Sequence, residues 1–369
     1  MEKNLSIIVA CGGTGGHAFP GLAAAQELAS RGHDVTIWDS GRNIESSVIR
    51  NWKGKVFSTG AKQLSPGNVF ANVRSMLRCR KEMRKARPDV LLAMGSYSSL
   101  PPVLAARGCK VPVVLHEANT VPGRAVEFLS RFAKSVAVSF ESTASCLPNV
   151  PTVRTGLPVR GDIASGKRFA SIPANAFTVF VTGGSQGAHA VNMLACEALV
   201  RLKKAIDAEP GGAQRPLYVI HQTGAADEGR TMAAYAVAGV PSRVKAFEDE
   251  MADALASADF VIARAGASTC FELAACGKCA LLIPLPSALR NHQHFNADAF
   301  ASRGAADEGI QSELEPDSLC SYLLAKYRNQ ERLAEMSSRI RALAVPDAAS
   351  RLADLVEASA ISPRTSAAV

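Results

Sequence analysis

Residues 7–17 read IIVACGGTGGH, and residues 179–189 read VFVTGGSQGAH. Each stretch has the pattern of a buried strand, two glycines, a hydroxyl residue, a further glycine and the start of a helix. Glycine lets the backbone approach a ligand closely, and a helix N-terminus offers N–H groups to an anion. The two stretches therefore predict a diverged internal repeat of two Rossmann-type halves, each with a turn for a phosphate or a sugar. A glycine turn that only packs against its own helix is the alternative interpretation.

The surrounding sequence alternates between apolar runs and helical patterns, which is typical of an α/β fold with parallel sheets. In the first half, strands are expected at 5–10, 35–38, 56–58, 90–94, 113–116 and 135–139, and helices at 20–30 and 69–86. A polar stretch at 161–175 suits a linker. The pattern then restarts, with strands expected at 177–181, 217–222, 243–246 and 260–263, and helices at 188–201, 252–257 and 268–276.

This pattern predicts one domain at 1–162 and a second at 163–345, which face each other across a cleft. The chain of 369 residues is long enough for two hydrophobic cores. In the tail, Pro316 and Pro346 are expected at helix starts. A last helix, at about 346–359, can pack back on the first domain.

The composition, 47% hydrophobic and 20% charged, is that of a soluble globular protein. No apolar run is long enough to span a bilayer and no signal segment is found, so a cytoplasmic protein is expected. The nine cysteines lack framework spacing, and Cys276-Gly277-Lys278-Cys279 has no second ligand pair. A net charge of +8 favours a phosphorylated substrate, an anionic membrane or a nucleic acid as partner. No strip of aromatic and basic residues supports nucleic-acid binding, so a nucleic acid is not expected as a partner.

A second informative region begins with RAGASTCFE at 264–272, where a strand ends and a helix opens. The helix N-terminus suits an anion, and Glu272, about one turn into the helix, can reach sugar hydroxyls. The stretch NHQHFN at 291–296 follows the next strand. It places His292, Gln293 and Asn296 at the carboxyl edge, where open α/β sheets bind ligands.

Three other polar residues are candidates for the site, and two of them allow two interpretations. His17 lies at a helix start, which disfavours the imidazolium, so it can accept a proton or fix its loop as a donor. Asn119 can bind a sugar hydroxyl or cap its own loop. The fork of Arg160 can neutralise a diphosphate.

Neither a metal site nor a cofactor is expected. The turn at 12–17 lacks the Lys-Ser/Thr of a nucleotide-hydrolysing loop and is not a clean G-x-G-x-x-G, so a nicotinamide enzyme is disfavoured, although Asp39 keeps it open. Glu248-Asp249-Glu250 resembles a metal-binding triplet, but we interpret it as a cap on the following helix.

Taken together, these residues resemble the N-acetylglucosaminyltransferases that form lipid II in peptidoglycan synthesis. The resemblance is carried by GGTGGHAFPGLAAAQEL at 12–28, HEAN at 116–119, GLPVR at 156–160, GGSQGA at 183–188, RAGASTCFELAACG at 264–277 and HQHFNA at 292–297. It implies the GT-B fold and an inverting transfer of N-acetylglucosamine from UDP-N-acetylglucosamine to undecaprenyl-diphospho-muramoyl-pentapeptide, lipid I. It also implies a peripheral protein at the cytoplasmic face of the inner membrane and no dedicated metal site.

By this resemblance, the donor contacts fall on Thr14, Gly15, Gly16, Asn119, Arg160, Ser185, Glu248, Ala267, Ser268, Thr269, Cys270, Phe271, Glu272, His292 and Gln293. His17 and Tyr97 match acceptor-side positions, and His17 is the candidate base. The chain departs from the family where GGYxSGP reads GSYSSLPP at 95–102 and where HEQN reads HEAN. Glu248 stands where an apolar residue is usual, so only its backbone contact with uracil carries over.

The alternatives are a UDP-sugar 2-epimerase of the same fold and a non-catalytic UDP-sugar-binding protein. Residues 69–87 offer a means of reaching a bilayer-bound acceptor on an anionic membrane surface. Their apolar stripe is Val69, Phe70, Val73, Met76, Leu77 and Met83, and the basic residues around it are Arg74, Arg78, Arg80, Lys81, Arg84, Lys85 and Arg87. In the competing interpretation, the stripe packs on the sheet and the arginines are solvated. Both interpretations hold if only part of the stripe is buried.

Overall fold

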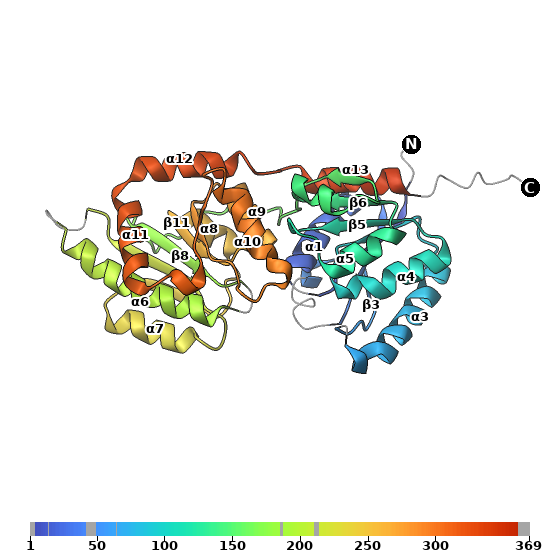
Figure 1. Cartoon of the computed structure of the whole chain (residues 1–369), viewed down its shortest axis with the longest axis horizontal. Helices are drawn as coiled ribbons and strands as arrows, with labels where there is room; N and C mark the ends of the chain where they lie inside the picture. Colours follow the sequence, from blue (N-terminus) through green and yellow to red (C-terminus); the bar gives the residue numbers. More distant parts are fainter. Residues whose placement is uncertain are drawn as a thin grey trace, which may run out of the picture. The chain divides into compact units, whose positions relative to one another are not determined.

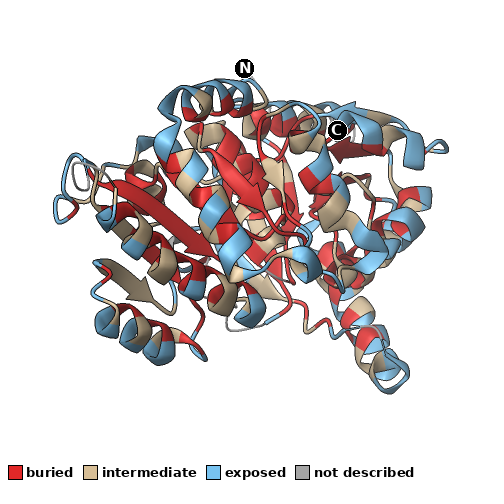
Figure 2. Cartoon of the chain, turned by 60° about the vertical axis from the view of Figure 1, so that its left-hand side comes forward, coloured by how far each residue is buried: buried red, intermediate tan, exposed pale blue. Residues whose placement is uncertain are grey.

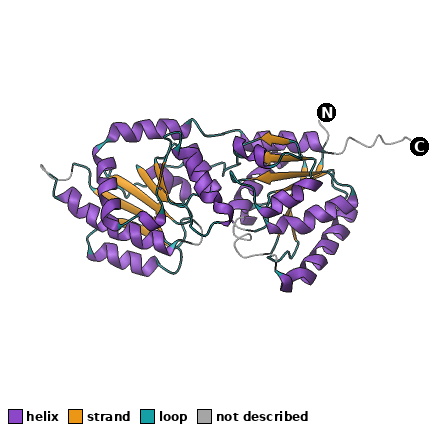
Figure 3. Cartoon of the chain, viewed as in Figure 1, coloured by secondary structure: helices purple, strands orange, loops and turns teal. Residues whose placement is uncertain are grey.

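The structure is a computed structural model that describes residues 4–13, 15–41, 49–63, 65–184, 187–209 and 214–360. Thr14 and Ser185, two of the expected donor contacts, lie outside this described part. The chain divides into two compact units, Met1–Arg160 with Val345–Val369 and Gly161–Ala344. Both units are layered α/β structures (Figures 1 and 3).

Within the described residues, the first unit holds a seven-stranded parallel sheet with the strand order β3-β2-β1-β4-β5-β6-β7. Its strands are β1 (Ser6–Ala10), β2 (Asp34–Asp39), β3 (Lys55–Ser58), β4 (Val90–Ala93), β5 (Val113–Glu117), β6 (Ser135–Val138) and β7 (Thr152–Arg154). Its α-helices are α1 (Gly15–Ser30), α3 (Val69–Ala86), α4 (Leu100–Cys109), α5 (Arg124–Leu129) and α13 (Ala348–Ser359). From β1 the strand order runs to β3 on one side, and from β4 to β7 on the other, so the topological switch point lies between β1 and β4. Ligands of such sheets bind at the carboxyl ends of the strands at the switch point.

Strand β1 shows why the sheet is covered on both faces. Ile7 and Val9 lie in the apolar cluster that includes residues of α1 and α13, whereas Ile8 lies in the cluster that includes residues of α3, α4 and α5. Successive residues of a strand point to opposite faces, so a strand buried on both sides reads as a continuous apolar run. In Figure 2, the most buried parts of the chain include strands, whereas the helices carry both buried and exposed faces.

Helix α13 packs on the first unit although it comes last in the chain. Leu352 and Val356 of α13 are buried in the same apolar cluster as Ile7. Arg31, which follows α1, donates hydrogen bonds to Asp354 at 2.6 Å and to Ser350. Helix α13 therefore forms part of the core and of the surface network of this unit.

The second unit holds a six-stranded parallel sheet within the described residues, in the order β10-β9-β8-β11-β12-β13. Its strands are β8 (Phe177–Thr182), β9 (Leu217–Gln222), β10 (Ser242–Lys245), β11 (Phe260–Ala263), β12 (Ala280–Leu282) and β13 (Asp307–Glu308). Its α-helices are α6 (His189–Asp207), α7 (Glu228–Val237), α8 (Met251–Ser257), α9 (Ala267–Cys276), α10 (His292–Ala301), α11 (Pro316–Arg328) and α12 (Gln330–Arg341). The first five strands repeat the order found around β1, so the prediction of two Rossmann-like halves is confirmed.

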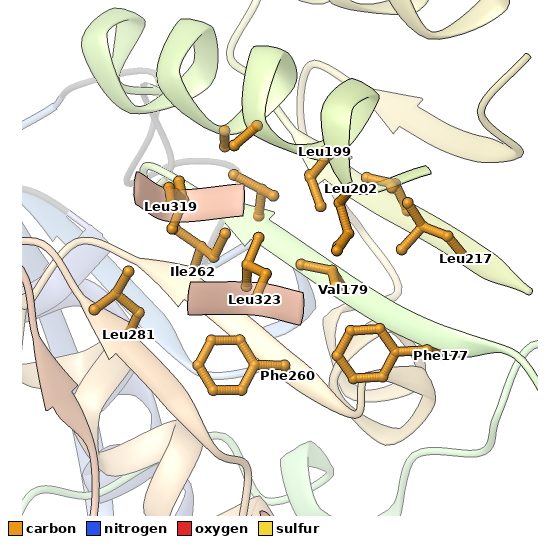
Figure 4. Packing of buried hydrophobic residues seen from close by; sticks show 14 of the residues in the cluster. Phe177, Val179, Leu199, Leu202, Leu217, Phe260, Ile262, Leu281, Leu319 and Leu323 are labelled. Atoms are coloured by element: carbon orange, nitrogen blue, oxygen red, sulfur yellow. The ribbon is translucent and has the colours of Figure 1, made fainter. Parts of the chain in front are cut away.

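A large apolar cluster of the second unit packs the sheet against α6 and α11, with further residues from α7 and α12. Figure 4 shows Val179 and Ile262 of the sheet against Leu199 of α6 and against Leu319 and Leu323 of α11. This packing leaves the carboxyl ends of β8, β9, β10 and β11 to be shaped by loops rather than by core side chains.

Three local predictions need correction. Helix α1 begins at Gly15 rather than at Pro20, which lies inside the helix. Pro346 lies before Asp347, the N-cap of α13, whereas Pro316 is the first residue of α11 as predicted. The expected linker at 161–175 packs on the second unit, where Ile163 is buried.

Candidate functional site

The carboxyl edge of the first sheet brings His17 against two glycine loops. A Cβ atom added to Gly13, whose φ is +127°, would lie 3.7 Å from Nδ1 of His17. A Cβ atom added to Gly95, whose φ is +83°, would lie 3.8 Å from Cδ2 of His17 and 3.2 Å from the carbonyl oxygen of His116. His17 lies in the first turn of α1 and is half-buried. The loops after β1 and β4 thus hold this imidazole at the ligand-binding edge.

His116 lies beneath this edge as a buried neutral imidazole. It is fully buried, and its Nε2–H donates to the carbonyl oxygen of Gly156 at 3.2 Å. The pKa of His116 is lowered from 6.5 to about 4, mainly by burial and to a smaller extent by the proximity of His17, while the hydrogen bond to Gly156 opposes the shift. The sequence motif contained His116, but its burial depends on three neighbouring strands and was not predicted.

The loop after β5 is organised by Glu117. One carboxylate oxygen accepts hydrogen bonds from the backbone N–H and the side-chain Nδ2 of Asn119, at 2.9 and 3.0 Å. The other accepts from the backbone N–H of Gly123 at 2.9 Å. Burial raises the pKa of Glu117. Asn119 therefore takes part in stabilising its own loop, as the loop-capping interpretation expected. The role of Glu117 in organising this loop was not predicted from the sequence.

The altered loop at 95–102 keeps a glycine-like backbone. Ser96 stands at the second glycine of the family motif and has φ 68° and ψ 163°, a conformation that glycine adopts more readily. Tyr97 begins the 3₁₀ turn Tyr97–Ser99, which leads into α4. Ser99 donates to the carbonyl oxygen of Gly95. The loop therefore bends as a glycine loop does while carrying a side chain at Ser96.

Arg160 follows β7 and is the last residue of the first of the two chain segments that form the first unit. Its guanidinium lies over the ring of Phe19 on α1, 4.8 Å from the ring centroid. Gly15 and Gly16, expected donor contacts, are the first residues of the same helix. Stacking on an aromatic ring restricts the orientation of a planar guanidinium.

In the second unit, the N-terminus of α9 forms the predicted strand–loop–helix. Gly266 is the N-cap, and Ala267, Ser268 and Thr269 form the first turn, whose N–H groups have no partner inside the helix. Asn296, which is fully buried, donates from Nδ2 to the carbonyl oxygen of Ala265 at 3.1 Å and so ties α10 to this loop. Asn296 is therefore a residue that fixes the loop.

The side chains on α9 divide between the core and the edge. Cys270 and Phe271 are buried, and burial raises the pKa of the Cys270 thiol to about 12. Phe271 packs edge-on against Phe300. Glu272 is half-buried. Of these three expected contacts, Cys270 and Phe271 can therefore offer a ligand only their backbone, whereas Glu272 can offer its carboxylate.

His292 and Gln293 lie at the start of α10. The Nδ1–H of His292 donates to the carbonyl oxygen of Leu289 at 2.8 Å, and Oε1 of Gln293 accepts from the backbone N–H of Leu285 at 2.9 Å. Both side chains therefore close the loop between β12 and α10. In this state, the amide nitrogen of Gln293 is the part of that side chain directed to other partners.

Glu248 belongs to an ionic cluster at the start of α8, and its carboxylate also accepts a hydrogen bond at 3.1 Å from the backbone N–H of Glu250, the N-cap residue. The carboxylate of Glu248 is paired with Arg243 at 2.9 Å and with Lys245 at 3.2 Å. Glu250, the N-cap residue of α8, makes no capping hydrogen bond with its side chain and pairs with Arg243 instead. Burial favours a raised pKa for Glu248, but the hydrogen bonds from Arg243 and Lys245 outweigh it and the pKa is lowered. No group of three His, Cys, Asp or Glu side chains able to hold a metal ion occurs among the described residues.

Helix α3 buries only part of the predicted apolar stripe. Met83 is buried in the cluster of the first sheet, and Met76 packs partly buried against it. The other apolar residues of the stripe, Val69, Phe70, Val73 and Leu77, are exposed, Phe70 to 90%. The rest of the buried side of α3 is formed by Asn72, Ser75 and Cys79.

Exposed basic residues accompany these apolar side chains on α3 and just after it, namely Arg74, Arg78, Lys81, Arg84, Lys85 and Arg87. Arg80 is partly buried and lies against α4, because a Cβ atom on Gly108 would be 3.6 Å from its Nε. Over the described ranges, no helix combines the length and the apolar character that crossing a bilayer requires. Helix α3 thus presents an exposed surface that is both apolar and cationic.

Comparison with known proteins gives a consistent result over nearly the whole chain. Residues 7–138 match the glycosyltransferase family 28 N-terminal domain, and residues 178–352 match the glycosyltransferase family 28 C-terminal domain. A protein of Trichlorobacter lovleyi is 35% identical over 95% of this chain and 97% of its own length. A protein of Geobacter sulfurreducens is 34% identical over 96% of this chain and 99% of its own length. Both are named UDP-N-acetylglucosamine–N-acetylmuramyl-(pentapeptide) pyrophosphoryl-undecaprenol N-acetylglucosamine transferase.

Solved structures agree. The crystal structure of MurG from Acinetobacter baumannii is 30% identical, covers 96% of this chain and 100% of its own, and has a TM-score of 0.75. A UDP-GlcNAc 2-epimerase from Neisseria meningitidis has a TM-score of 0.70 at 12% identity, a likeness that shows the fold alone. Because relatives more than 30% identical match over nearly their full length, the chain belongs to glycosyltransferase family 28 and, within it, to the UDP-N-acetylglucosamine–N-acetylmuramyl-(pentapeptide) pyrophosphoryl-undecaprenol N-acetylglucosamine transferases.

Proposed function

We propose that this protein transfers N-acetylglucosamine from UDP-N-acetylglucosamine to lipid I and so forms lipid II for peptidoglycan synthesis. The observation that carries the proposal is the match to transferases of this name, 33–35% identical over 94–96% of the chain. The 2-epimerases share the fold at 12–13% identity, which does not argue for their activity.

In this proposal, the second unit binds the donor. The N-terminus of α9 and the glycine turn after β8 present backbone N–H groups to the diphosphate, where negative charge grows as UDP leaves. Glu272 accepts hydrogen bonds from ribose hydroxyls, and the backbone of Glu248 reads the uracil base. Arg160, held on Phe19, supplies positive charge to the diphosphate. These fixed dipoles and the guanidinium take the role that a metal ion has in other sugar transfers.

The first unit binds the acceptor and supplies the base. The hydroxyl oxygen of the muramoyl sugar attacks C1 of N-acetylglucosamine, and the bond from C1 to the diphosphate oxygen breaks with inversion at C1. The proton of that hydroxyl passes to His17, since the start of a helix disfavours a permanently charged imidazolium. The electron pair of the broken bond leaves with UDP. Tyr97 lies on the same edge, in the loop that we assign to the acceptor.

The transferase proposal is tested by following UDP release from UDP-N-acetylglucosamine with and without a lipid I analogue. Release should depend on the analogue, and the product should carry one added N-acetylglucosamine. An epimerase would instead convert the donor to its 2-epimer without an acceptor. A pure binding protein would bind UDP and release none. Either result would overturn the proposal.

We also propose that the protein visits the cytoplasmic face of the inner membrane as a peripheral protein and docks through α3. Support comes from the exposed Phe70 and Leu77 beside the exposed cations Lys81 and Lys85. A helix of this kind lies in the interface with its apolar side inserted, and each basic residue adds roughly 1 kcal/mol near an anionic surface.

Co-sedimentation with vesicles tests this docking surface. The double change Lys81→Glu and Lys85→Glu should weaken binding to anionic vesicles about tenfold or more, since it reverses two attractive charges. The matched control changes Lys167→Glu and Lys204→Glu, which reverse the same charge on exposed residues of the second unit and should have little effect. Equal losses in the two variants would show that only net charge matters. Binding that is indifferent to lipid charge and to salt would exclude electrostatic docking.

A further inference from the structure

Gln222 lies where the two donor-binding loops of the second unit begin. It is the last residue of β9, and the sheet register pairs it with Thr182 at the end of β8 and with Lys245 at the end of β10. The glycine turn follows β8, and the segment that holds Glu248 follows β10. A side chain at this position can therefore reach both loops.

The carboxamide of Gln222 makes hydrogen bonds to both loops. Its Nε2 donates to the carbonyl oxygen of Gly184 at 2.8 Å and to the hydroxyl of Thr182 at 3.3 Å. Its Oε1 accepts from the backbone N–H of Glu248 at 3.1 Å. The side chain is buried, with 2% of the residue exposed. A carbonyl oxygen only accepts and a backbone N–H only donates, so these partners fix the orientation of the carboxamide.

On the β8 side, Gln222 holds the carbonyl group that also closes the glycine turn. The carbonyl oxygen of Gly184 accepts from the backbone N–H of Gly187 at 3.0 Å, and both residues have positive φ, +88° and +75°. A Cβ atom on Gly187 would lie 2.1 Å from the carbonyl oxygen of Thr223. The turn is therefore pressed against the end of β9, and Gln222 fixes its first carbonyl group.

On the β10 side, Glu248 is held by two independent sets of interactions. Its carboxylate is bound by Arg243 and Lys245, whereas its backbone N–H is bound only by Gln222 among the contacts that the structure records. The ion pairs can keep the segment near β10 without Gln222. They do not set the direction in which the peptide groups of Glu248 point, which is what the hydrogen bond to Gln222 determines.

We propose that Gln222 is a positioning residue of the donor site, which sets the diphosphate turn and the uracil-reading backbone in register with each other. The inference rests on the proposed function, in which the glycine turn meets the diphosphate and Glu248 meets the base. UDP spans both groups, so a protein in which the two loops are already linked loses less conformational freedom when UDP binds. Gln222 itself does not need to touch the ligand.

The test compares Gln222→Met, which keeps the size of the side chain and removes its hydrogen bonds, with Gln330→Met at an exposed position of the same unit. We expect the Kd for UDP, measured by calorimetry, and the KM for UDP-N-acetylglucosamine to rise about 10- to 100-fold in Gln222→Met, which corresponds to about 1.4–2.7 kcal/mol. The KM for the lipid I analogue should stay within about twofold, because a link that affects donor binding alone leaves the acceptor loops unchanged. Gln330→Met should match the wild type.

Gln222→Glu provides a second readout. A protonated carboxyl group can donate to Gly184 and accept from Glu248, as the carboxamide does, whereas a carboxylate cannot donate. We therefore expect Gln222→Glu to bind UDP more tightly, relative to the wild type at the same pH, as the pH falls from about 8.5 to about 6. Buried carboxyl groups can have pKa values raised into this range. A merely structural residue would show no such recovery.

The outcomes separate the inference from the proposed function. If the wild type binds UDP and Gln222→Met binds it within about threefold, the inference is wrong and the proposed function stands. If the Kd rises but Gln222→Glu shows no pH-dependent recovery, the linking role is also wrong. If the wild-type protein does not bind UDP at all, the proposed function fails, and the inference fails with it.

Discussion

Acidification should weaken the first unit, because His116 binds a proton less readily in the folded protein than in the unfolded chain. This imidazole is fully buried, and burial lowers its pKa from 6.5 to about 4. Between these two pH values, the unfolded chain binds a proton that the folded chain does not. The free energy of unfolding therefore falls as the pH falls through this range, and the contribution is complete above about pH 6.5.

The pKa shift sets the size of the effect. Lowering the pKa of His116 from 6.5 to about 4 contributes about 3 kcal/mol to the free energy of unfolding at neutral pH. About 2 kcal/mol of this contribution is lost between about pH 7.5 and pH 5. Urea unfolding followed by tryptophan fluorescence measures this loss. Trp38 and Trp52 are the two tryptophans of the chain and both lie in the first unit, so the fluorescence reports on that unit.

Two variants isolate the contribution of His116 from those of other titrating groups. His116→Gln keeps a donor for the carbonyl oxygen of Gly156 but does not titrate, so its loss of stability on acidification should be about 2 kcal/mol smaller than in the wild type. His221→Gln removes a buried histidine of the second unit, whose pKa burial lowers to about 3, and should leave the pH dependence of the fluorescence transition unchanged. If His116→Gln and the wild type lose stability equally, the buried imidazole is not the cause.

Four further outcomes are expected. His17→Ala should lower kcat by on the order of 10²–10⁴-fold with little change in the donor KM, and a loss of less than about threefold would indicate a loop-fixing role. Glu272→Ala should raise the donor KM about tenfold or more with unchanged thermal unfolding, and an unchanged KM would remove Glu272 from the site. Ser96→Gly should raise the free energy of unfolding by about 1 kcal/mol in urea titrations, because the backbone there has φ 68°, and a loss of stability would show that Ser96 is unstrained. Turnover in detergent should survive excess EDTA, and a complete loss restored by magnesium or manganese would show that the reaction needs a metal ion.

The elements that the sequence predicted well are those in which local pattern and burial agree. Helix α3 runs from Val69 to Ala86, as its periodicity indicated, and β9 and β11 have the predicted bounds. The start of α1 was missed because the two glycines at 15 and 16 have low helix propensity, and proline usually marks a first turn. There, packing of small residues against the sheet outweighs the intrinsic preference of Gly15 and Gly16.

The candidate site was predictable as a set of loops but not as a set of contacts. The strand ends located His17, Asn119 and Glu272 on the correct edges, because parallel strands all end at the same side of a sheet. The pairing of Glu248 with Arg243 depends on how the chain turns after β10, which no local periodicity encodes. The opposite charges five residues apart, at 243 and 248, were nevertheless visible in the sequence as a possible pair.

The position of α13 has a consequence for how the protein can be made. Strand β1 leaves the ribosome long before α13, yet the cluster that buries Ile7 is completed only by Leu352 and Val356. Domains commonly fold in the order of their synthesis. Here the first unit cannot complete its core until the second unit and α13 have been translated, and part of its apolar surface stays uncovered until then. A fragment that ends near residue 160 should therefore need α13 supplied separately, as a peptide or through a fusion, to become a stable soluble domain.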